Sequence, residues 1–108
     1  MQYEERFTEE ELGMVIEQGM IYMCACPAQV ADAIRKLRAL YRYQLQCLQT
    51  PDTDAAVHGA IAKSTAQAHA TMQDCLDEVI KLEHWDRATL QMPSGLRTRQ
   101  MQALLSDD

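Results

Sequence analysis

Three of the four cysteines are predicted to gather at one end of the molecule. Cys24 and Cys26 are separated by one residue, and Cys75 follows much later in the chain. If the segments around them form antiparallel helices that turn near residue 51, counting at equal rise sets Cys75 level with about residue 28. The same counting sets Cys47 level with about residue 56, at the opposite end. We therefore expect a cluster of Cys24, Cys26 and Cys75.

Such a cluster suggests three interpretations. Thiolates from all three cysteines, with Glu78 or solvent as a fourth ligand, would suit zinc or another thiophilic metal, although a Cys-x-Cys pair is tighter than the usual zinc spacing. Alternatively, a helix N-terminus at Cys26 would favour a reactive thiolate, with Cys24 or Cys75 as its resolving partner. We favour the third interpretation, in which the thiols are small buried residues in a tight corner.

Three arginines form a second candidate site. Arg35, Arg38 and Arg42 recur at steps of three and four residues, so they share one face of a predicted helix. They could bind an anionic partner or pair with the acidic N-terminal segment. Residues 1–26 hold six acids and one base, a net charge of −5, whereas residues 27–50 hold one acid and four bases, a net charge of +3. This asymmetry favours pairing within the chain.

The remaining polar residues give no catalytic signature. The chain has no Gly-x-Ser-x-Gly, no phosphate-binding glycine loop and no Glu-x-x-His pair. His69, Met72 and Cys75 recur at three-residue steps, and we expect them to pack in a core with His69 at its edge. The net charge of −6 argues against binding nucleic acid. We therefore expect neither catalysis nor a cofactor.

The N-terminal helix has a clear start signal. Thr8 and Glu11 have the spacing of a capping box, in which each side chain accepts from the backbone N–H of the other. Phe7 and Leu12 on either side have the spacing of a hydrophobic staple. The four predicted helices are at about 8–25, 27–49, 53–84 and 95–105, as judged from apolar periodicity and breakers.

The breaks between these helices are predicted from proline and turn residues. Pro27 is expected to be the first residue of the second helix, with Cys26 as its N-cap. Residues 50–54 have turn composition. After the third helix, which we expect to end near His84, a short amphipathic arm is expected to lie on the bundle through Trp85, Leu90 and Met92.

Apolar stripes indicate which helix faces are buried. The second helix has a stripe at Val30, Ile34, Leu37, Tyr41, Leu45 and Leu48. The stripe predicted for the third helix comprises Val57, Ile61, Ala68, Met72, Cys75, Val79 and Leu82. Within it, Ile61, Ala68, Cys75 and Leu82 are seven residues apart, a period typical of coiled coils.

These features predict a single all-α domain over residues 1–108. Its architecture is an up-down antiparallel three-helix bundle with a short C-terminal fourth helix. The N-terminus has no signal-peptide pattern, and the longest apolar run, residues 20–26, is too short to span a bilayer, so we expect a cytoplasmic protein without membrane association.

The predicted function follows from what the bundle leaves open. Three helices of this length leave one side open. Either the C-terminal segment fills it, which would give a closed monomeric four-helix bundle, or a second chain does, and we favour the homodimer. We expect a small non-enzymatic protein that acts through protein–protein contacts. The alternative is a thiol-based redox or metal-responsive protein that uses Cys24, Cys26 and Cys75.

Overall fold

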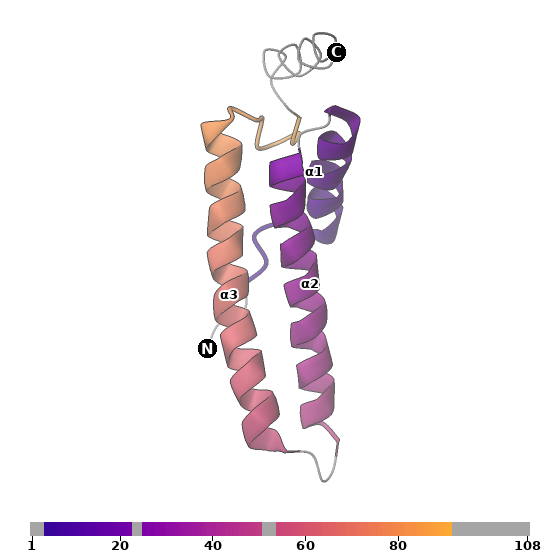
Figure 1. Cartoon of the computed structure of the whole chain (residues 1–108), viewed down its shortest axis with the longest axis vertical. Helices are drawn as coiled ribbons and strands as arrows, with labels where there is room; N and C mark the ends of the chain where they lie inside the picture. The colour runs from indigo at the N-terminus through magenta and orange to yellow at the C-terminus, as the bar shows by residue number, and fades with distance from the viewer. Residues whose placement is uncertain (1–3, 23–24, 51–53, 92–108) are drawn as a thin grey trace, which may run out of the picture.

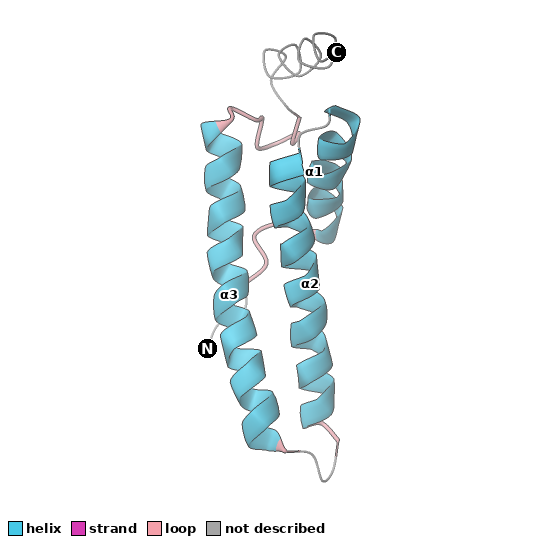
Figure 2. Ribbon diagram, viewed as in Figure 1, coloured by secondary structure: helices cyan, strands magenta, loops and turns pink. Residues whose placement is uncertain are grey.

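The computed structural model describes residues 4–22, 25–50 and 54–91, which form three helices (Figures 1 and 2). Helix α1 spans Glu9–Tyr22, α2 spans Ala25–Leu48 and α3 spans Ala55–Leu82. The second and third helices form a long antiparallel hairpin, and α1 lies beside the part of α2 nearest its start (Figure 1). The predicted all-helical class is confirmed for these residues. The fourth helix predicted at 95–105 lies outside the described residues.

The start of α1 matches its sequence signal. The Thr8 backbone N–H donates to the Glu11 carboxylate at 2.9 Å, and the Glu11 N–H donates to Thr8 Oγ1 at 3.0 Å. The bond from the Thr8 backbone lowers the pKa of the Glu11 carboxyl, and Arg87 lowers it further. Phe7 and Leu12 are both buried in one apolar cluster. The predicted capping box is confirmed, and the two apolar residues expected to flank it share the core.

The start of α2 differs from its prediction. The helix begins at Ala25, so Cys26 and Pro27 lie inside its first turn rather than at the N-cap and the first position. Backbone N–H groups in the first turn have no acceptor within the helix, so proline loses no hydrogen bond there. Pro27 is also buried. The prediction of Cys26 as N-cap is therefore wrong.

The ends of α3 are fixed by local hydrogen bonds. At its start, the Asp54 carboxylate accepts from the Val57 N–H at 3.3 Å. At its end, the Trp85 N–H donates to the Ile80 carbonyl at 2.9 Å and the His84 N–H donates to the Lys81 carbonyl at 3.1 Å. His84 has φ of 61°, the left-handed conformation of a Schellman ending. This ending turns the chain back, so that Trp85 lies against the core.

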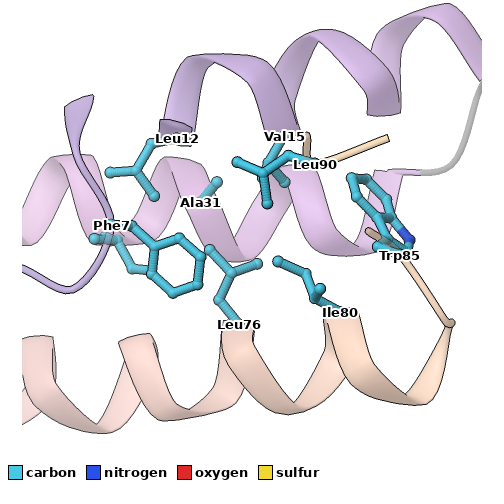
Figure 3. Packing of buried hydrophobic residues seen from close by; sticks show 9 residues of the cluster. Phe7, Leu12, Val15, Ala31, Leu76, Ile80, Trp85 and Leu90 are labelled. Atoms are coloured by element: carbon cyan, nitrogen blue, oxygen red, sulfur yellow. The ribbon is translucent and has the colours of Figure 1, made fainter. Parts of the chain in front are cut away.

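The core lies where α1, the hairpin and the segment after α3 meet (Figure 3). Its buried apolar residues are Phe7, Leu12, Val15, Ala31, Ile34, Leu76, Ile80, Trp85 and Leu90. Trp85 and Leu90 therefore pack on the bundle as predicted for the arm, while Met92 lies outside the described residues. The apolar core is concentrated at the end of the hairpin that α1 covers.

The buried face of α3 is not the predicted apolar stripe. Its buried residues are Ala62, Thr65, Ala66, His69, Gln73, Leu76 and Ile80. By contrast, Val57 is 49% exposed and Leu82 is 70% exposed. The core face is displaced from the predicted stripe by about one residue, a rotation of about 100°. The prediction failed because this face includes polar residues, which a search for apolar periodicity passes over.

Candidate functional site

The structure describes two of the three residues of the predicted cysteine cluster. Cys26 is exposed in the first turn of α2, Cys75 is half-buried on α3, and Cys24 lies outside the described residues. Cys47 is near the other end of α2, at the opposite end of the hairpin from Cys26. The three cysteines in the described part of the chain are free thiols. Residues 4–22, 25–50 and 54–91 contain no group of three or more His, Cys, Asp or Glu that could hold a metal.

The three arginines have different surroundings. Arg35 donates to the Glu9 carbonyl at 3.1 Å, and its Nε lies 3.5 Å from the Glu9 carboxylate. Arg38 is fully buried and pairs with the same carboxylate at 2.9 Å. These contacts are of the kind expected from pairing with the acidic N-terminal segment. Arg42 is exposed, and its role toward a partner stays a prediction.

Arg38 is the centre of a buried polar network that joins three segments of the chain. Its Nε–H donates to His69 Nε2 at 2.9 Å, and Nη2 donates to Gln73 Oε1 at 3.1 Å, so two bonds reach α3. Nη1 donates to Glu9, and Nη2 also donates to the Phe7 carbonyl, so two more bonds reach the N-terminal segment. We call Arg38, His69, Gln73, Glu9 and the Phe7 carbonyl the Arg38 cluster.

Gln73 extends this network to the residues that precede α1. Its Oε1 accepts from the backbone N–H of Arg6 at 2.7 Å and of Phe7 at 3.3 Å. Its Nε2 donates to the Glu4 carbonyl at 2.7 Å. One buried amide therefore satisfies three backbone groups of the lead-in to α1, and it holds that lead-in against α3.

The surroundings of His69 favour its neutral form. Burial lowers the pKa of His69, and the charge of Arg38 lowers it further, while Glu5 and Glu9 act in the opposite direction. A neutral imidazole has one acceptor nitrogen, and the hydrogen bond from Arg38 assigns that role to Nε2. The proton of neutral His69 is therefore on Nδ1.

Arg87 contacts the N-terminal segment on the side facing solvent. Its guanidinium donates to the Glu11 carboxylate at 2.8 Å and to the Arg6 carbonyl at 3.0 Å. It also lies over the Phe7 ring, 4.2 Å from the centroid. Arg6 pairs with Asp74 on α3. The segment after α3 thus holds the lead-in from outside while the Arg38 cluster holds it from inside.

The chemistry of the Arg38 cluster is structural. The four bonds of Arg38 are all to groups of this chain, and its side chain has no exposed area for a substrate to contact. From the sequence, Arg38 was expected to share a helix face with Arg35 and Arg42 and to pair with the acidic N-terminal segment, and His69 was expected at the edge of the core. A usable signal was present, because Thr65, His69 and Gln73 are four residues apart and form a polar row on one helix face.

The side of the hairpin turned away from α1 is the second notable feature. Asp74 and Asp77 mark the flank of α3 that meets Arg6 and Arg87. The predicted seven-residue repeat lies on the opposite flank. On α2, Leu40 and Tyr43 lie about 200° and 140° around the helix from Arg38. We call this side the uncovered face, and it comprises Leu40, Tyr43, Val57, Ile61, Ala68, Cys75 and Leu82.

Residues of the uncovered face are apolar but poorly buried. Tyr43 is 60% exposed, Val57 is 49% exposed and Leu82 is 70% exposed. Among the described helices, α1 packs on α2 and α2 packs on α3, so none of them lies over this face. The Cys47 thiol contacts the Tyr43 hydroxyl, and this hydrogen bond raises the pKa of Tyr43.

No protein-family model, curated protein or solved structure matches this chain. None of the helices in the described part of the chain has the length and apolarity needed to cross a membrane.

Proposed function

We propose that this protein acts through protein–protein contacts, without catalysis of its own, and that the uncovered face binds a second copy of the chain. The observation that carries this proposal is the repeat of Ile61, Ala68, Cys75 and Leu82 on α3, of which Ala68 and Leu82 are exposed while Ile61 and Cys75 are half-buried. A seven-residue spacing keeps such side chains in line along the contact when two helices wrap around each other. An apolar repeat of this kind is stabilised when a second helix covers it.

The sizes of the side chains suit close packing of helices. Ala68 and Ser64 are small and exposed, so a neighbouring backbone can approach α3 at its middle. Leu40 and Tyr43 stand beside them on α2, at 41% and 60% exposure. Large side chains from one copy can therefore fill the space above small side chains of the other. Aromatic residues with few charges around them are typical of interface centres.

Charge also favours a second copy on this face. The chain has a net charge of −6, so two copies repel each other over most of their surfaces. The α3 residues of the uncovered face carry no charge. Because α1 lies on the opposite side of each hairpin, it does not obstruct a two-fold arrangement in which the same face meets itself. The product would be four antiparallel helices with one α1 outside each pair.

A single charge on the uncovered face tests this proposal. Ala68→Glu places a carboxylate in the middle of the repeat at an exposed position, where glutamate is a good helix former. Ala70→Glu is the matched control, because residue 70 is also exposed and lies about 200° around the helix from residue 68. In sedimentation at high micromolar concentration, we expect dimers for the wild-type chain and Ala70→Glu, and monomers for Ala68→Glu.

Two outcomes would contradict the proposal. A wild-type chain that is monomeric at high micromolar concentration would remove the dimer. Equal sedimentation of the two glutamate variants would show that the contact surface lies elsewhere. Far-UV circular dichroism of both variants separates loss of dimer from loss of helix.

A thiol-based function is the second candidate, and the exposure of Cys26 favours it. Cys26 lies in the first turn of α2, where its thiol is open to reagents in solution. A reactive thiol would be alkylated much faster at Cys26 than at half-buried Cys47. Mass spectrometry after brief exposure to iodoacetamide measures both rates, and equally slow labelling would remove this candidate. Elemental analysis of protein purified without chelator tests the metal alternative.

A further inference from the structure

The Arg38 cluster joins the N-terminal segment to both helices of the hairpin. One acceptor in it, the imidazole of His69, can also take up a proton. We propose that this cluster is an acid-sensitive latch, in which protonation of His69 releases residues 4–22 from a hairpin that stays folded. The inference does not depend on the proposed dimer, because every group in it belongs to one chain.

The latch depends on the hydrogen bond between Arg38 and His69. His69 Nε2 accepts from Arg38 Nε–H at 2.9 Å, and both side chains are fully buried. A protonated imidazole carries N–H on both nitrogens and cannot accept. Protonation therefore removes this bond and places a second cation against the guanidinium, away from water.

The charged groups facing His69 come from each segment packed around it. Arg38 faces it from α2, Glu9 from α1 and Glu5 from the lead-in. On α3, the other side chain bonded to Arg38 is that of Gln73, which is neutral. The two carboxylates favour the protonated form, but burial and Arg38 outweigh them, so the pKa of His69 lies below its ordinary value. The folded state then binds this proton more weakly than the released state.

The sign of the pH dependence follows from this lowered pKa. At pH values above the ordinary histidine pKa, His69 is neutral in both the folded and the released state. The Arg38 cluster then holds the N-terminal segment most strongly. As the pH falls from that value toward the lowered pKa, the released state takes up the proton first, and the latch weakens.

The N-terminal segment is the part released because its buried hydrogen bonds to α3 all belong to this network, whereas its pair between Arg6 and Asp74 is at the surface. The Phe7 carbonyl and the Glu9 carboxylate bind Arg38, and the Arg6 and Phe7 N–H groups bind Gln73. The backbone of α1 lies close to α2 rather than to α3, and α1 meets α3 through apolar side chains of the shared core. The hairpin keeps bonds of its own far from the latch, including the one between His58 and Gln44 at 2.6 Å.

Amide hydrogen exchange tests the latch, because it reports local opening segment by segment. Between about pH 7.5 and pH 5.5, after correction for intrinsic exchange, we expect protection of α1 to fall by up to about tenfold per pH unit while α3 is unchanged. His69→Gln should abolish this pH dependence, since the glutamine oxygen can accept from Arg38 and does not titrate. His58→Gln is the matched control and should leave it intact.

Three results would overturn the proposal. The first is an unchanged pH dependence of α1 exchange in His69→Gln. The second is equal loss of protection in α1 and α3, which would mean global unfolding. Should His69→Gln fail to fold, NMR titration of the wild-type imidazoles still decides. The third result would be a His69 pKa at or above the ordinary histidine value, or a His69 titration that does not coincide with the change in α1 exchange.

Discussion

The two sides of the α2–α3 hairpin differ in what lies against them. On one side, α1 and its lead-in cover a fully buried arginine, a histidine and a glutamine, together with the apolar core. On the other side, no described helix covers Tyr43, Val57 or Leu82. Polar residues of α3 such as His69 and Gln73 are thus buried, whereas apolar residues such as Val57 and Leu82 are exposed. Side-chain type alone did not decide which face is buried.

The physical cause of this inversion is the buried guanidinium. An arginine without exposed area requires acceptors for its N–H groups, because an unpaired buried charge is very costly. The face of α3 next to Arg38 supplies them through His69 and Gln73, while α1 supplies the Glu9 carboxylate. Turning these side chains inward turns the seven-residue repeat outward. The covered side therefore combines buried hydrogen bonds with the apolar core, whereas apolar side chains of the uncovered side are exposed.

The largest difference between the two sides should come from arginine substitutions on α2. Arg38→Gln shortens the buried side chain and leaves its partners unpaired, so we expect a loss of about 3–5 kcal/mol in the free energy of unfolding. Arg42→Gln, at an exposed position one turn later, should change it by less than about 0.5 kcal/mol. Urea denaturation at low protein concentration measures both. Similar values for the two variants would contradict the structural role of Arg38.

Leucine truncation on α3 gives the second comparison. Leu76 is fully buried and Leu82 is 70% exposed. Leu76→Ala should cost about 3 kcal/mol because it leaves a cavity in the core, whereas Leu82→Ala should cost under about 0.5 kcal/mol in the monomer. At high micromolar concentration, Leu82→Ala should also weaken the proposed dimer. Equal costs at low concentration would show that Leu82 is buried within one chain.

The smallest effects should come from two glycines in helices. A Cβ added at Gly59 meets no atom within 4 Å, so Gly59→Ala should stabilise the fold by about 0.5–1 kcal/mol through helix propensity. A Cβ at Gly13 would lie 2.9 Å from Arg35 Nη2, which donates to the Glu9 carbonyl. Gly13→Ala should gain less, or lose stability, because Arg35 must give up that bond. Thermal melts of both variants rank them, and the reverse order would refute tight packing at Gly13.

Features of the fold that depend on neighbouring residues were predictable from the sequence. The capping box of Thr8 and Glu11 and the helix end near His84 each need only a few adjacent residues to form, and both are present. The start of α2 was misplaced by two residues, because a helix tolerates proline anywhere in its first turn. Of the predicted cysteine cluster, Cys26 and Cys75 are described, and their association with Cys24 stays a prediction.

By itself, the sequence determined the helical class, the main breaks and the acidic and basic segments that pair between α1 and α2. Only the tertiary structure decided the rotation of α3, the burial of Arg38 and its joining to His69 and Gln73. The reason is that apolar periodicity records which residues avoid water, whereas a buried cation is satisfied by acceptors from distant segments. Those acceptors are polar, so the face that carries them resembles a solvated surface until the chain is folded.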